Sequence, residues 1–180
     1  LKREDYTKNG IRIIQLQNIG DGKFLNKYKI YTSNTKADEL KSCNIYPGDI
    51  ILSKMGDPVA RATSIPDFDT RYLMASDGIR LSINKKEYDT TFILESINNY
   101  TFRNQADLSS TGSTRKRIGL VELRELKIVI PPLSEQKKIT SIITSLDQRL
   151  NLLMKKLSQN QSLKKSLMQD LLTGKVRVTV

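Results

Sequence analysis

The chain has 180 residues, a mean hydropathy of −0.42 and a formal net charge of +11, which together indicate a soluble domain with an appendage rather than a membrane protein. It contains no histidine, which excludes Ser-His-Asp or Cys-His catalysis and zinc sites with imidazole ligands. Its single cysteine, Cys43, excludes an internal disulfide and points to a reducing compartment.

The first 130 residues or so have the pattern of an irregular, β-rich domain, in which short strands alternate with turns. We expect strands at 11–19, 50–55 and 76–83, and turns at 20–22 and 44–49.

Three further segments follow before the chain changes character. The apolar spacing of residues 87–108 favours a helix, and residues 109–117 form a small, polar stretch. A last strand at 125–130 should end at Pro131–Pro132, because proline cannot donate to a strand ladder.

A long helix is predicted after the two prolines. Ser134 is a plausible N-cap, and neither proline nor glycine interrupts the sequence before Gly174, a natural residue to follow the last turn. A helix over residues 135–172 would be about 57 Å long. Apolar residues recur along it at alternating spacings of four and three, as in a coiled-coil seam. They are Ile139, Ile143, Leu146, Leu150, Leu153, Leu157, Leu167 and Leu171.

Such a stripe has to be buried against another surface. The helix could lie across its own domain, but we favour a second helix, in the same full-length chain or in a second copy. The polar seam residues Asn160 and Lys164 would then help to set the register. The chain therefore divides into a domain at 1–132, a helix at 133–173 and a tail at 174–180.

The positive charge is concentrated in the last 70 residues. Residues 1–110 carry 16 Lys and Arg against 14 Asp and Glu, whereas residues 111–180 carry 14 against 5. A polyanion is the natural partner for this field, with nucleic acid ahead of an anionic membrane surface. A charge that serves only solubility is the alternative.

Candidate DNA contacts are cations beside turns. Lys54 and Arg61 flank a glycine turn, and Arg71 and Arg80 stand out in the nearly neutral part of the chain, where a base-reading role would be noticeable. The segment 111–117 suits phosphate binding, since it combines small residues, hydroxyls and three cations. Its candidates are Gly112, Ser113, Thr114, Arg115, Lys116 and Arg117. Each single cation has the alternative of being a solvated surface charge.

Enzymatic patterns are weak. Asp67, Glu125 and Lys127 are similar to the carboxylate-and-lysine metal site of many nucleases, but nearly sixty residues separate the two parts, so a metal-dependent nuclease stays an alternative only. The segment IPPL (130–133) lacks the Asn or Asp and the aromatic residue of an adenine methyltransferase loop. We therefore expect a non-catalytic chain without a metal site.

Three segments together resemble one family. They are IPPLSEQKKITSIITSLDQRL (130–150), LMQDLLTGKVRV (167–178) and STGSTRKRIGLVELRELKIVIPP (110–132). The chain resembles, over essentially its whole length, the DNA-specificity (S, HsdS) subunits of type I restriction–modification systems. The resemblance implies an α+β fold, in which a β-rich target recognition domain is followed by a long coiled-coil helix. It also implies that the domain reads one half of a bipartite double-stranded DNA site.

The resemblance also implies partners. Methyltransferase subunits with S-adenosylmethionine would dock through the long helix, and restriction subunits would use ATP and Mg²⁺. This chain would hold no cofactor and would supply sequence choice alone, in the cytoplasm of a prokaryote. It would be the C-terminal half of a two-domain subunit, or a half-subunit that pairs as a homodimer. A further alternative is an assembly module whose helix binds protein while its domain reads no DNA.

Overall fold

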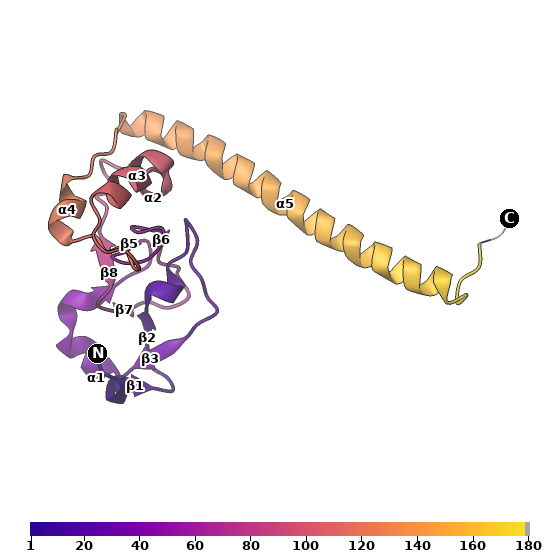
Figure 1. Ribbon diagram of the computed structural model, residues 1–180, viewed down its shortest axis with the longest axis horizontal. Helices are drawn as coiled ribbons and strands as arrows, with labels where there is room; N and C mark the ends of the chain where they lie inside the picture. The colour runs from indigo at the N-terminus through magenta and orange to yellow at the C-terminus, as the bar shows by residue number, and fades with distance from the viewer. Residues whose placement is uncertain (179–180) are drawn as a thin grey trace. The chain divides into compact units, whose positions relative to one another are not determined.

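A computed structural model describes residues 1–178 of the chain and separates them into two compact units, Leu1–Lys137 and the part from Lys138 onward. The first unit contains both sheets and four short helices, and the second consists mostly of one long helix (Figure 1). Among the residues described, no helix has both the length and the apolar composition needed to cross a membrane.

A five-stranded sheet and a three-stranded sheet form the centre of the first unit (Figure 1). The larger sheet has the order β1-β3-β2-β7-β4, in which β2 and β7 are parallel and the other pairs antiparallel. The smaller sheet is antiparallel, with the order β6-β5-β8. The strands are β1 (Tyr6–Thr7), β2 (Ile11–Ile14), β3 (Ile30–Thr32), β4 (Asn44–Ile45), β5 (Ile50–Ser53), β6 (Ala62–Ser64), β7 (Tyr72–Met74) and β8 (Gly78–Leu81).

Aliphatic side chains from both sheets form the core. Ile14, Ile45, Ile51 and Tyr72 belong to one buried cluster, against which Phe24 packs. All four residues of β5 are buried, as is usual for a strand covered on both faces. The predicted strands at 50–55 and 76–83 are thus confirmed in their central residues, and the α+β fold class is confirmed.

Four short helices accompany the sheets, and three short 3-10 turns complete the unit. The helices are α1 (Asn34–Glu39), α2 (Thr90–Asn98), α3 (Tyr100–Leu108) and α4 (Leu120–Glu125). The turns are η1 (Arg3–Asp5), η2 (Leu16–Asn18) and η3 (Lys41–Cys43).

The predicted helix at 87–108 is in fact two helices, α2 and α3, separated at Asn99. This residue adopts an extended conformation, and its side-chain oxygen accepts a hydrogen bond from Thr101 N at 3.0 Å. It therefore ends one helix and caps the next. An asparagine prefers such a cap to a helix interior, because its side chain competes for backbone hydrogen bonds.

Two strand predictions need correction. The strand expected at 11–19 ends at Ile14, because the Asn18 side chain accepts from Gln15 N and stabilises a 3-10 turn. The strand expected at 125–130 is wrong, since α4 occupies 120–125 and an irregular segment follows. There the side-chain amide of Gln105 bonds to both backbone groups of Lys127, at 3.1 Å each. A side chain takes the place of a neighbouring strand.

The long helix α5 (Leu133–Leu172) has 40 residues and is about 60 Å long. It begins at Leu133, and the Pro132 carbonyl accepts from the backbone N–H of Gln136, so the predicted N-cap at Ser134 is wrong. Gly174 has a φ of +71° and donates to the Leu171 carbonyl, which confirms its predicted role after the last turn.

Candidate nucleic-acid interface

The turn between β5 and β6 is joined by its backbone to the polar segment at 111–117. Gly56 N donates to the Lys116 carbonyl at 3.1 Å, and Ile118 N donates to the Lys54 carbonyl at 3.0 Å. The segment thus pairs with the chain just beyond the end of β5, the central strand of the small sheet. Two stretches that lie about sixty residues apart in the sequence, and that both carry predicted DNA contacts, are adjacent in the fold.

Thr111 and Arg117 close the cationic loop, which we define as residues 111–117. Gly112 has a φ of +98°, and a Cβ at this position would lie 2.8 Å from the Arg115 carbonyl, so the loop requires glycine here. Ser113, Thr114 and Arg115 are exposed. Small hydroxyl residues beside cations are suited to phosphate oxygens.

The cations of this loop differ in their partners. Lys116 Nζ lies 2.5 and 2.6 Å from the two Asp107 carboxylate oxygens, and Arg117 lies 3.2 Å from Asp77. Within residues 1–178, the Arg115 side chain makes no hydrogen bond or ion pair. Arg115 is therefore the loop cation whose charge is most available to an incoming anion.

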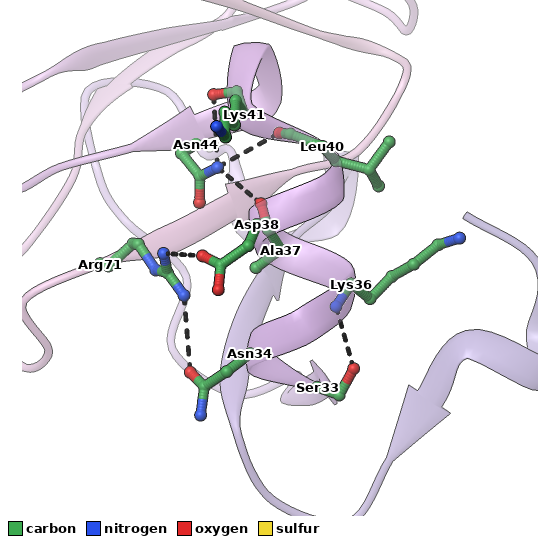
Figure 2. A network of polar contacts seen from close by, with 9 residues as sticks. All are labelled: Ser33, Asn34, Lys36, Ala37, Asp38, Leu40, Lys41, Asn44 and Arg71. Carbon is green, nitrogen blue, oxygen red and sulfur yellow. Dashed lines mark hydrogen bonds and ion pairs between the residues drawn. The ribbon is translucent and has the colours of Figure 1, made fainter.

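Arg71 is engaged in a network that fixes α1 (Figure 2). Its guanidinium donates to Asp38 at 2.6 Å and to the Asn34 side chain at 3.5 Å. Asn44 donates to three carbonyls at the end of the same helix, and Ser33 caps its start. Arg71 thus has a structural role next to β7, and its DNA contact stays a prediction.

Arg80 is also held by the protein. Its Nε lies 2.9 Å from the Asp49 carboxylate, Nη1 donates to the Asn44 carbonyl at 3.2 Å, and the guanidinium lies over the Tyr46 ring. These contacts secure the turn that leads into β5. A base-reading role for Arg80 likewise stays a prediction.

Arg61 ends the turn that Lys54 begins, and Arg103 of α3 contacts the backbone of this turn. Arg103 Nη1 donates to the Val59 carbonyl at 3.1 Å, and its Nη2 contacts Asp21. Burial lowers the pKa of the Arg103 guanidinium; Asp21 opposes the shift, and the nearby positive charge of Arg61 adds to it. Two guanidinium groups therefore lie close together here with one carboxylate.

A cavity of about 420 Å³ lies next to the cationic loop, because Asp77 lines it and also pairs with Arg117. Its walls include Tyr6 of β1, and Gln15, Gln17 and Ala75, which follow the carboxyl ends of the parallel strands β2 and β7. Gln17 donates to the Gln15 side chain at 3.0 Å. The sequence analysis missed these amides, which can offer a donor and an acceptor to a base edge. The sequence feature that could have indicated them is their position directly after a strand.

The residues of the nuclease alternative are exposed and lie on separate elements. Asp67 is in the loop after β6, and Glu125 is the last residue of α4. Among the side chains of residues 1–178, no group of three or more His, Cys, Asp or Glu is arranged to hold a metal ion.

The apolar seam of α5 is exposed along most of its length. Exposed fractions run from 42% at Leu171 to 59% at Leu157, and Ile139 and Ile143 are less exposed. Ile142 and Met154, which flank the seam, are exposed by 64% and 67%. An apolar surface of this extent is usual for a helix that packs against another chain.

The chain thus combines a β-rich domain that carries a cationic loop with a long helix that exposes an apolar seam. Residues 5–163 match the family model of the type I restriction modification DNA specificity domain, and the chain belongs to this family.

Among curated proteins, the chain is similar to specificity subunits of type I restriction enzymes. The type I restriction enzyme MjaVIII specificity subunit of Methanocaldococcus jannaschii is 23% identical over 181 residues, which cover 98% of this chain and 42% of that protein. The putative type I restriction enzyme specificity subunit S.HindORF215P of Haemophilus influenzae is 30% identical over 132 residues, covering 72% of this chain and 32% of that protein.

Solved structures share the fold. The HsdS subunit from Thermoanaerobacter tengcongensis has a TM-score of 0.64 at 18% identity, covering 88% of this chain and 41% of that one. The S subunit of a type I system from M. genitalium has a TM-score of 0.59 at 18% identity, covering 94% and 40%. The chain thus spans less than half the length of each of these relatives.

Proposed function

We propose that the first unit, residues 1–137, binds double-stranded DNA and selects its sequence, reading one half of a bipartite site. Membership of the DNA specificity family supports this proposal. The single observation that carries it is the backbone ladder between the β5–β6 turn and the cationic loop, which brings the segments of Lys54, Arg61 and Arg115 together around the end of β5. Specific DNA binding needs both phosphate contacts and base contacts, and this part of the fold offers groups for each.

In this proposal the phosphate contacts come from the cationic loop, and the base contacts come from amides beside the cavity. Arg115 is exposed and has no side-chain partner among residues 1–178, so it can contact a phosphate at little cost. The amides of Gln15 and Gln17, at the cavity beside Asp77, are candidates for base edges. The first set would supply affinity that depends on salt, and the second would supply discrimination.

The helix α5 would join this unit to the rest of a restriction–modification complex. Its exposed seam is the surface that we assign to a second helix, from another recognition module or from a second copy of the chain. Methyltransferase subunits would dock on the paired helices. One solved relative, with a TM-score of 0.64, comes from work on complex assembly and conformational transition of a type I system.

Catalysis would belong to the partners in this scheme. S-adenosylmethionine would be bound by the methyltransferase subunits, and ATP with Mg²⁺ by restriction subunits. The present chain would contribute sequence choice, with no cofactor of its own.

Selection from a random double-stranded DNA library tests the proposal. The intact gene product that contains these residues is co-expressed with its methyltransferase subunits, and bound DNA is sequenced after several rounds. Enrichment of a short motif, alone or repeated at fixed spacing, is expected. An intact complex that enriches no motif would leave an assembly role for the chain. Cleavage by the chain alone with Mg²⁺, lost in Asp67→Asn, would support the nuclease alternative.

A further inference from the structure

Arg61 carries a guanidinium for which residues 1–178 provide no acceptor. The side chain is half-buried, its Nε is enclosed, and no hydrogen bond or ion pair is formed by any of its nitrogens. Four other arginines of the unit contact a carboxylate; they are Arg71, Arg80, Arg103 and Arg117. The buried Arg12 has no such contact but donates to the Asn26 side chain and the Tyr28 carbonyl. Arg61 is thus a partly buried positive charge without a counter-ion.

A second positive charge, the guanidinium of Arg103, lies near Arg61 and is unfavourable for it. The guanidinium of Arg103 lies near enough for its pKa to be lowered, first by its own burial and further by the charge of Arg61. Asp21, the nearby carboxylate, already contacts Arg103. A cation withdrawn from water is destabilised unless an acceptor replaces the lost solvation. An acceptor from outside the chain would relieve this cost.

The backbone holds Arg61 in one place. Ala60, immediately before it, is buried and has a φ of +56°, a left-handed conformation that non-glycine residues seldom adopt. Ala60 N donates to the Ser53 carbonyl at 3.0 Å, and Ser53 N donates to the Arg61 carbonyl at 2.8 Å. Such residues persist where the surroundings hold them, and they cluster at ligand sites. The guanidinium is therefore presented from a pre-organised turn.

Gly56 lies beside the terminal nitrogens of Arg61 and has no side chain that could cover them. A Cβ on Gly56 would lie 3.1 Å from Arg61 Nη2, and the φ of +134° at this position also favours glycine. Because Nε is enclosed, an acceptor pair can approach only the two terminal nitrogens. Two parallel N–H donors of this kind match the O6 and N7 acceptors of guanine in the major groove.

We propose that Arg61 is a specificity-determining residue that donates from Nη1 and Nη2 to O6 and N7 of one guanine in the DNA site. The inference rests on the proposed DNA-reading function and adds a residue and a base to it. Phosphate contacts are left to the exposed loop, above all to Arg115. Arg61 suits a fixed base edge better, since its position is set by the turn.

The experiment removes the acceptor and the donor separately. Wild-type complex first yields the selected motif, and each of its guanines is then replaced in turn by 7-deazaguanine, which lacks N7. At one position this replacement should weaken wild-type binding about tenfold. Arg61→Gln should weaken binding to the unmodified site about tenfold. The affinity of this variant should then fall by less than about twofold when the same guanine is replaced by 7-deazaguanine. Its own selected motif should be degenerate at that position.

Two further variants sharpen the result. Arg61→Lys keeps the charge but lacks the two-donor fork, so it should lose the same guanine preference. Arg124→Gln removes an equal charge from an exposed position on α4 and should leave the motif unchanged. The 7-deazaguanine series on wild-type complex needs no variant to fold.

Several outcomes would overturn the inference. One is a wild-type motif without guanine, or one in which 7-deazaguanine has no effect at any position. Another is an Arg61→Gln variant that weakens binding to every sequence equally and lowers the salt slope by about one, which marks a phosphate contact. A wild-type complex that selects no motif would instead refute the DNA-reading function, and the inference would fall with it at the first step.

Discussion

Thr111 and Arg117 exchange both of their backbone hydrogen bonds, at 2.9 and 2.8 Å, and so form the base of the loop that exposes Arg115. Met55 pairs with Arg117 on the other side, so the loop is anchored to the turn after β5. A loop fixed at its base can present a cation without a large loss of conformational entropy on binding.

Arg115→Gln should weaken binding to all DNA sequences and lower the slope of log affinity against log salt by about one, because one phosphate contact is lost. Lys116→Gln should have a smaller effect on that slope, since Lys116 already pairs with Asp107. Affinities measured at several salt concentrations, from about 50 to about 300 mM, provide the slopes for wild type and both variants. Equal slopes for wild type and Arg115→Gln would remove Arg115 from the interface.

Arg71→Gln should affect stability rather than DNA recognition. Its partner Asp38 is 59% exposed, so loss of the pair should lower the free energy of unfolding by at most about 1 kcal/mol. Asp38→Asn should have a similar effect, and both variants should bind the selected motif within about twofold of wild type. Urea unfolding and equilibrium binding measure the two quantities. An altered motif in Arg71→Gln would instead establish the base-reading role.

Gln136 ties the first turn of α5 to the start of α2 and is 1% exposed. It accepts from Asp89 N at 2.9 Å and donates to the Pro131 carbonyl at 2.8 Å. Gln136→Ala should lower the free energy of unfolding by about 1 to 3 kcal/mol, because both backbone groups lose their partner.

A matched control for Gln136 is available on the same helix. Gln148 is exposed, so Gln148→Ala should change stability by less than about 0.5 kcal/mol. Gln136→Glu should also destabilise, since a carboxylate cannot donate to the Pro131 carbonyl. Urea unfolding of the three variants gives the comparison, and equal stabilities would show that the buried amide contributes nothing.

Leu146→Asp with Leu153→Asp should abolish the pairing of α5 with a second helix while leaving the first unit folded. Both side chains lie in the seam and are exposed by 54% and 55%, and charges there would be buried on pairing. Leu152→Asp is the control, because Leu152 is 69% exposed and lies outside the seam. Sedimentation equilibrium and co-purification with methyltransferase subunits report the pairing. Pairing that survives the double substitution would refute the seam assignment.

Long-range periodicity and residue chemistry made several features predictable. The helix over 135–172 is predicted from the apolar spacing and from the absence of proline and glycine, and α5 is a single helix over Leu133–Leu172. Spacing and helix propensity depend on residues a few positions apart, so the sequence alone is sufficient for this prediction. The apolar residues Ile50, Ile51 and Leu52 likewise mark β5, which is buried at every position. The family resemblance follows from the segments around Pro131–Pro132 and is confirmed by the match over residues 5–163.

Contacts between residues far apart in the chain could not be predicted from the sequence. Segment 125–130 has strand-like composition, yet a side-chain amide of Gln105 takes the place of a neighbouring strand. Arg61 and Arg71 look alike in sequence, but in the fold Arg71 pairs with Asp38, whereas Arg61 has no carboxylate partner among residues 1–178. Composition and period act within a few residues, so the sequence alone determined the class, the helix and the cationic segment. The tertiary structure decided which cations are neutralised, because ion pairs and enclosure depend on neighbours brought together only by folding.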